Sequence, residues 1–340
     1  MLVYKSENII LIIICISILA CNVNSNSKLP DISNIEKIVE IKNFEKALFQ
    51  TNVKGQPFSQ ERLLNDFPAF YPFYANELMQ WDSQDTTKWK NALLEFTKNQ
   101  DIQSLYDSVS VKFNNLETIN KELVTAFKYF QYYFPDHKIP DVVYFISGFR
   151  QMALTLDNDV LGIGLDMHMG KDFKYYNATG YPKYSINQFT KEHLSSHAME
   201  VWAQQIHPEP LPVSRFIDEM IYRGKMLYFL DLVLPSVSDH LKIGYETDQL
   251  DWCKNNEKEI WEFFVEKKIL FENTSAKFKY YINDGPHSNG MPKKAPGKIG
   301  RWVGWQIVRK FMDQNPDVSV QELFEISDGA KILKKSKYKP

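Results

Sequence analysis

The sequence lacks a segment long enough to cross a membrane. The longest apolar run in its 340 residues is Ile9 to Ala20, which only Cys15 and Ser17 interrupt. At about 12 residues this run is shorter than the roughly 20 helical residues that span a bilayer, and with Lys5 before it the run has the pattern of a signal peptide. We therefore expect residues 1–20 to be removed and the remaining chain to be soluble.

The chain also contains few cysteines, 3 in the full sequence. One of them, Cys21, follows Ile18-Leu19-Ala20, and this order of two aliphatic residues, a small residue and a cysteine resembles the lipobox of bacterial lipoproteins. In a lipobox the small residue admits the peptidase and the thiol receives the lipid. The pattern predicts lipidation at Cys21, with a polar tether over residues 21–30. The alternatives are an ordinary cleaved signal with a chance cysteine, and an uncleaved anchor.

After such processing, Cys253 is the one cysteine left in an oxidising compartment, so an internal disulfide is excluded. Cys253 lies in an apolar helical stripe, which favours a small buried side chain over a reactive thiol. No acidic cluster directly follows Cys21. Because such clusters resemble a surface-export signal in the Bacteroidetes, we expect a lipid-anchored position in the cell envelope, at the outer membrane and facing the periplasm.

The chain also lacks an excess of charge of either sign. It has 40 Lys and Arg against 42 Asp and Glu, a net charge of -2, and the two signs are interspersed. A nucleic-acid partner would require a basic patch, so we expect none. Aromatic residues make up 14% of the sequence, which indicates a well-packed body, and we assign residues 31–340 to a single globular domain.

Apolar residues three and four positions apart predict a mostly helical chain. The expected helices are Ser59–Asn65, Ala69–Met79, Thr86–Lys98, Leu116–Tyr133, Ile186–Gln205, Ser214–Leu234, Glu246–Lys268, Gly300–Asp313 and Ser319–Ile326. The segment Glu272–Gly297, rich in Gly, Pro, Asn and Lys, is predicted to be a long loop, and such loops are more often functional than inert. Gly300 and Gly304, one helical turn apart, are expected to let another element pack closely.

Three bounded apolar runs predict strands. Pro140–Gly148 is interpreted as a buried strand, and Gln151–Leu156 and Val160–Leu165 as two more, joined by a turn at 157–159. A further strand is expected at the start of Ile38–Phe49, whose second half also fits a helix. We therefore predict the α+β class, mostly helical, with a small antiparallel sheet formed by the three consecutive strands.

His193-Leu194-Ser195-Ser196-His197 is the sharpest local pattern. Two histidines at i and i+4 share a helical face and can bind one zinc ion. The metallopeptidase motif has a Glu in the position of Leu194, where it activates the metal-bound water. Glu219 on the next helix is a candidate third ligand, although zinc peptidases of this layout carry a Glu-Gly pair where this chain has Arg223-Gly224. Core or solvated histidines, a metal site without catalysis and an active peptidase all stay open.

Several cations border the predicted loop and the Gly-rich helix after it. They are Lys293, Lys294, Lys298 and Arg301. Structural packing is one interpretation of this segment, and contact with an acidic partner or with lipid headgroups is the other. Lys337 and Tyr338, in the terminal segment, are further candidate contacts.

Four segments together resemble the gliding motility lipoprotein family GldB of the Bacteroidetes. They are Ile163–Asp166, Met220–Phe229, Gly297–Arg309 and Lys335–Pro340, and the similarity extends from Cys21 to the last residue. The resemblance implies a role in the machinery with which these bacteria glide on surfaces, a machinery tied to type IX secretion. It specifies no biochemical activity.

Two functional hypotheses follow. The first is a non-enzymatic lipoprotein without a cofactor, held to a membrane by its lipid, that docks onto other gliding or secretion proteins through the 272–297 loop and the C-terminal tail. The second is a zinc-dependent, peptidase-like enzyme of the cell envelope. The order of small sheet, histidine helix and Gly-rich helix looks like a degenerate zinc-peptidase scaffold and motivates the second hypothesis.

Overall fold

The structure is a computed structural model that describes residues 29–36, 39–50, 60–81, 86–209 and 215–340. The predicted signal peptide, the lipidation at Cys21 and most of the predicted tether lie outside the described residues. The chain divides into two compact units, Met1–Asp31 and Ile32–Pro340. The described helices and strands all belong to the second unit.

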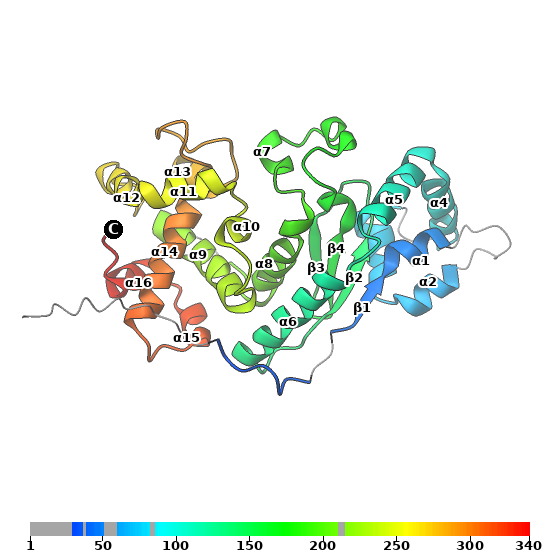
Figure 1. Cartoon of the computed structure of the whole chain (residues 1–340), viewed down its shortest axis with the longest axis horizontal. Coiled ribbons are helices and arrows are strands. Elements are labelled where there is room, and N and C mark those ends of the chain that lie inside the picture. The colour runs from blue at the N-terminus through cyan, green and yellow to red at the C-terminus, as the bar shows by residue number, and fades with distance from the viewer. Residues whose placement is uncertain (1–28, 37–38, 51–59, 82–85, 210–214) are drawn as a thin grey trace, which may run out of the picture. The chain divides into compact units, whose positions relative to one another are not determined.

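Four strands form one mixed sheet (Figure 1). They are β1 (Ile41–Asn43), β2 (Asp141–Phe145), β3 (Ala153–Leu156) and β4 (Val160–Gly164), arranged in the order β1-β2-β4-β3. Both β1 and β4 run parallel to β2, whereas β3 runs antiparallel to β4. Together with the surrounding helices, this sheet confirms the α+β class.

The pairing of the sheet differs from the expected antiparallel arrangement. β3 and β4 do form the predicted hairpin, with Asp157 of its turn at a φ of 45°. The hairpin folds back so that β4, rather than β3, lies beside β2. A parallel neighbour such as β1 needs a crossover of a dozen residues or more, and the helices between residues 44 and 140 provide it. Short apolar runs do not reveal this long-range pairing.

The two faces of the sheet bury different parts of the chain. Along β2, Val143 and Phe145 point into one core and Val142 and Tyr144 into the other, because side chains alternate along a strand. The first core contains residues of α1 (Phe44–Gln50), α2 (Gln60–Asp66), α3 (Phe70–Phe73), the π-helix η1 (Tyr74–Leu78) and α4 (Thr86–Lys98). This layer separates one side of the sheet from solvent.

The second core is larger and includes the helices that carry the candidate site. Its long helices are α5 (Gln100–Lys112), α6 (Glu117–Tyr133), α8 (Leu194–Ile206), α9 (Phe216–Val233) and α14 (Ile299–Gln314). The shorter elements are η2 (Leu165–His168), η3 (Lys174–Ala178), α7 (Lys183–Ile186), η4 (Lys191–His193), α10 (Asp239–Ile243), α11 (Thr247–Asn255), α12 (Glu257–Glu266), α13 (Ser275–Ile282), α15 (Val320–Glu325) and α16 (Gly329–Ser336). Cys253 is buried here, as expected, and burial raises the pKa of its thiol to about 12.

Most of the predicted helices are confirmed, and the differences have local causes. Helix α4 has the predicted bounds, but the predicted helix Glu246–Lys268 is divided at Asn256. The side-chain amide of Asn256 donates to the carbonyl oxygen of Trp252 at 2.7 Å and so competes with the helical hydrogen bonds. The predicted loop 272–297 contains α13, and the apolar pattern predicts neither α5 nor α16.

Helices α9 and α14 cross at two glycines. A Cβ atom on Gly304 would lie 1.9 Å from the carbonyl oxygen of Met220, and one on Gly224 would lie 2.3 Å from the carbonyl carbon of Gly304. Both distances are far below van der Waals contact, so the two backbones touch and only glycine fits. The close packing expected at Gly304 is confirmed.

We predict that Gly304→Ala strongly destabilises the protein, because the added methyl group forces two helix backbones apart. Overpacking a buried contact costs about 1–3 kcal/mol, and a clash with backbone places this change at or above the upper end. Urea unfolding followed by circular dichroism measures the loss. Gly285→Ala is the matched control, since a Cβ there would meet its nearest neighbour only at 3.8 Å. Equal losses in the two variants would contradict the prediction.

Glu45 of α1 is a buried carboxylic acid, and its Oε2 has no hydrogen-bond partner. Burial raises the pKa of this carboxyl group from 4.5 to about 8. Between these pH values the folded protein keeps a proton that the unfolded chain has lost. The contribution of Glu45 to stability is therefore fully present below the lower pKa and is lost as the pH rises through the upper one.

We predict that Glu45→Gln removes this pH dependence, because the amide does not ionise. Relative to the variant, the wild-type free energy of unfolding should fall by up to about 1.4 kcal/mol per pH unit between about pH 5 and pH 8. Urea unfolding across this range tests it. Glu61→Gln, which alters an exposed carboxylate in α2, serves as the control and should follow the wild type. Parallel pH curves for wild type and Glu45→Gln would show the idea to be wrong.

Candidate functional site

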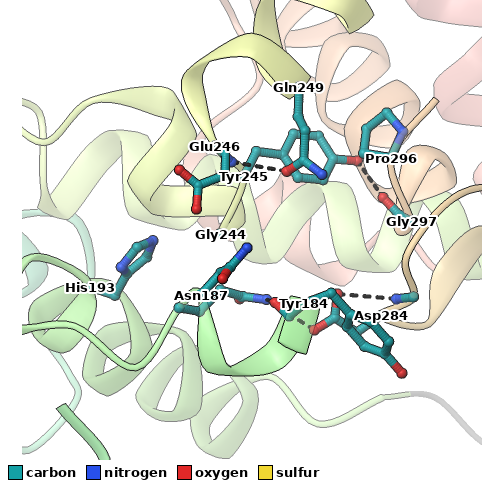
Figure 2. Close-up of a pocket in the computed structure, with 12 residues that line it drawn as sticks. Tyr184, Asn187, His193, Gly244, Tyr245, Glu246, Gln249, Asp284, Pro296 and Gly297 are labelled. Atoms are coloured by element: carbon teal, nitrogen blue, oxygen red, sulfur yellow. Dashed lines mark hydrogen bonds between the residues drawn. The ribbon is translucent and has the colours of Figure 1, made fainter. Parts of the chain in front are cut away.

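A groove lies between α7 and η4 on one side and α10 and α11 on the other. Its wider part has a volume of about 590 Å³, within the range of ligand-binding sites, and a narrower part continues from it toward Asp284 and Gly297. Figure 2 shows the narrower part, with α7 on one side and the start of α11 on the other. The residues that line both parts are Asn187, His193, Tyr245 and Glu246.

Side-chain hydrogen bonds fix the walls of the groove. The hydroxyl of Tyr245 donates to the carbonyl oxygen of Gly297 at 2.6 Å, and the Gln188 amide donates to Asp284 at 2.9 Å. The charged side chains along the lining carry both signs and include Lys112, Lys171, Asp172, Glu192 and Glu246. Such a lining suits a polar ligand or a peptide of mixed charge rather than a lipid or a highly charged polymer.

His193 lines the groove at the junction of η4 and α8. Its Nδ1 lies 3.0 Å from the Thr190 hydroxyl, while its Nε2 is buried without a hydrogen-bond partner. An unpaired buried polar atom costs about 1–3 kcal/mol, so such atoms are uncommon in folded proteins. His193 therefore presents an unused donor or acceptor.

Two further histidines are in contact next to His193. The ring centroid of His197, one turn along α8, lies 5.6 Å from that of His193, and its Nδ1 lies 3.1 Å from Nε2 of His168. His168, the last residue of η2, donates from Nδ1 to the carbonyl oxygen of Gly164 at 2.8 Å. Because a carbonyl oxygen only accepts, the neutral His168 ring has a bare Nε2, which accepts the Nδ1–H of His197.

The spacing of His193 and His197 in the sequence does not point to His168 as part of this cluster. His168 and His197 are 29 residues apart in the sequence, and they meet because β3 and β4 pack against α8. The signal that points to His168 is a histidine one turn after the end of a buried strand. The location of this histidine in the fold depends on the pairing of β4 with β2, and the apolar pattern of the strands does not predict that pairing.

Burial lowers the pKa of all three histidines. The pKa of His168 and that of His193 each fall to about 4, and the pKa of His197 lies well below its ordinary value, with repulsion from the other two rings and from Lys298 adding to the effect. The three imidazoles are therefore neutral at pH 7. Neutral imidazoles carry lone pairs, so the cluster consists of hydrogen-bonding groups and metal ligands rather than cations.

Glu219 does not join these histidines. Its carboxylate accepts a hydrogen bond from Nε of Arg223 at 2.8 Å, and Arg223 also donates to Glu209 at 2.9 Å. Within the described residues, no three His, Cys, Asp or Glu side chains are placed together as a ready metal site. The structure thus does not bring together His193, His197 and Glu219, because Arg223 one turn along α9 binds the carboxylate.

The four cations expected to face a partner separate into two pairs. Lys293 and Lys294 are exposed, whereas Lys298 is buried with its Nζ 3.5 Å from Asp284. Arg301 donates from Nε to the last carbonyl oxygen of α13 at 2.7 Å. Lys298 and Arg301 therefore stabilise the loop before α14, which is the packing interpretation, and Lys293 and Lys294 alone are available at the surface.

The C-terminal segment, which carries the candidate contacts Lys337 and Tyr338, folds back onto α12. Lys337 is exposed, but Tyr338 is only 8% exposed. The Tyr338 hydroxyl donates to Glu257 at 2.7 Å, and its ring meets that of Trp261 edge-on at a centroid distance of 5.3 Å. Tyr338 is a packing residue because its aromatic ring finds an apolar partner on α12.

We predict that Tyr338→Ala lowers the free energy of unfolding by about 3 kcal/mol, since removal of a buried aromatic ring leaves a cavity. Thermal and urea unfolding measure the change. Lys337→Ala, one residue earlier and exposed, should change stability by less than about 0.5 kcal/mol. If the two variants were equally stable, the tail would not be packed as described.

The chain is therefore an α+β protein with a small mixed sheet, a large helical core and a groove beside a cluster of neutral histidines. The chain belongs to the GldB family: the model of the family described as gliding motility protein GldB matches residues 25–340, nearly the whole chain. This confirms the resemblance and implies involvement in gliding motility, and a lipoprotein role fits the family. No curated protein and no solved structure matches the chain. None of the described helices is both long enough and apolar enough to span a membrane.

Proposed function

We propose that the chain is a non-catalytic docking component of the gliding machinery, anchored to the outer membrane through lipid on Cys21 and facing the periplasm. In this proposal the groove between η4 and α11 receives a polypeptide segment of another envelope protein of the gliding or type IX secretion apparatus. The groove carries the proposal because it has a volume of about 590 Å³ and is lined by charged side chains of both signs. Membership of the GldB family indicates that the cellular process is gliding motility.

The chemistry beside the groove supports binding over peptide hydrolysis. A metallopeptidase needs a carboxylate in the position of Leu194 to activate water, and here the Leu194 side chain is fully buried in the larger core. Glu219, the acidic residue that the sequence pattern suggests as a third ligand, accepts a hydrogen bond from Arg223. Neither residue is placed to take a proton from water at the histidines.

We predict that Asn187→Arg abolishes gliding without unfolding the protein. Asn187 lines both parts of the groove and is partly exposed, so a longer cationic side chain fills the groove rather than the core. Spreading on agar measures gliding, and thermal unfolding of the purified variant checks the fold. Lys98→Glu, at the exposed end of α4, changes charge away from the groove and should glide normally.

Site-specific photocrosslinking in living cells tests the docking step directly. A photoreactive residue at Glu192 or at Thr247, which lie on opposite walls of the groove and are exposed, should capture the same envelope protein, and Asn187→Arg should abolish that product. The photoreactive residue placed at Lys98 instead should not capture this envelope protein. Capture that survives Asn187→Arg, or release of a cleaved partner fragment, would overturn the docking proposal.

A further inference from the structure

Two imidazole nitrogens in the core are placed as a pair of metal ligands would be. Nε2 of His168 and Nδ1 of His197 lie 3.1 Å apart. Two nitrogens bound to one tetrahedral metal ion at about 2.0–2.1 Å lie roughly 3.3 Å from each other. When a metal ion takes the place of the proton between the two rings, that proton moves to Nε2 of His197 and the rings rotate so that both lone pairs meet at the ion. The distance between the two nitrogens changes by only a few tenths of an ångström.

The second nitrogen of His168 is already oriented as metal-binding histidines require. Ligating histidines characteristically donate their other ring N–H to a carbonyl or carboxylate, which fixes the ring and the tautomer. His168 does so through Nδ1 to Gly164 at the end of β4. Since β4 is paired on both sides and α8 is a long buried helix, both rings are attached to rigid elements.

His193 offers a third nitrogen. Its Nδ1 contacts the Thr190 hydroxyl, and its Nε2 is buried and unpaired. In the described part of the chain no three ligand side chains already converge, so His193 would join the pair only after a change of side-chain rotamer. Its ring centroid is 5.6 Å from that of His197, and the ring also borders the groove, which leaves a fourth position for water or a ligand.

We propose that His168 and His197, with His193 as third ligand, bind one divalent ion of the zinc class. Imidazole nitrogen is a ligand for Zn²⁺, Co²⁺, Ni²⁺ and Cu²⁺, whereas Mg²⁺ and Ca²⁺ prefer oxygen. The ligand set differs from the one suggested by the sequence, because His168 takes the place of Glu219. The proposal is independent of docking at the groove.

Metal binding to the wild-type protein is the first test, and it requires no variant. The intact lipoprotein is purified in detergent, freed of metal with a chelator and titrated separately with Zn²⁺ and Co²⁺. We expect one equivalent of Zn²⁺ per chain, and X-ray absorption at the zinc edge should report imidazole nitrogens at about 2.0–2.1 Å. A folded wild-type protein that takes up no zinc, or that binds it through oxygen alone, overturns the proposal.

Matched variants then assign the ligands. His168→Gln and His197→Gln should each weaken zinc binding at least 100-fold, and His193→Gln about 10-fold. Two controls should leave the affinity unchanged: Glu219→Gln, which removes the ligand suggested by the sequence, and His207→Gln, which removes another histidine with a buried, unpaired Nε2. Circular dichroism confirms that each variant folds. Zinc binding that is lost in Glu219→Gln, or retained after both His168→Gln and His197→Gln, contradicts the assignment.

Discussion

The contact of α9 with α14 at Gly224 and Gly304 connects the core of the protein to the groove. Because the two backbones touch, Arg309 of α14 reaches both Asp231 of α9 at 2.7 Å and Asp239 of α10 at 2.8 Å. Asp239 is the first residue of α10, and α10 and α11 form one wall of the groove. A wider spacing between α9 and α14 would therefore separate Arg309 from one of its two carboxylates and release that wall.

The charged groups at this crossing fix the positions of the helices relative to one another more than they raise the free energy of unfolding. Asp231 accepts hydrogen bonds from Arg309, from Lys242 at 2.9 Å and from the Trp305 indole at 2.8 Å, so one carboxylate joins three elements. Partly buried ion pairs lose much of their attraction to the cost of leaving water, and their clearest effect is to select one arrangement of the chain. The Asp231 contacts therefore favour the one arrangement of α9, α10 and α14 in which α10 forms a wall of the groove.

Features that depend on neighbouring residues were open to prediction from the sequence, and features that depend on distant ones were not. The α4 bounds, the β3–β4 hairpin and the close packing at Gly304 follow from local patterns. The parallel position of β1, the burial of Tyr338 and the meeting of His168 with His197 all require the tertiary fold. The spacing of His193 and His197 predicts that the two rings lie on one face, and they are in contact. The side chain hydrogen-bonded to His197, however, comes from η2 after a strand rather than from the next helix.

The side chains around the three histidines connect the docking proposal with the metal proposal. In α9, Arg223 binds the carboxylate of Glu219, and in α8 Leu194 belongs to the apolar core, so neither position supplies the carboxylate base of the peptidase motif. A metal ion held only by neutral imidazoles would keep its double positive charge, and at a fourth position open to the groove that charge would attract an electron-pair donor. An ion at the histidines would therefore strengthen the binding of a partner side chain in the groove.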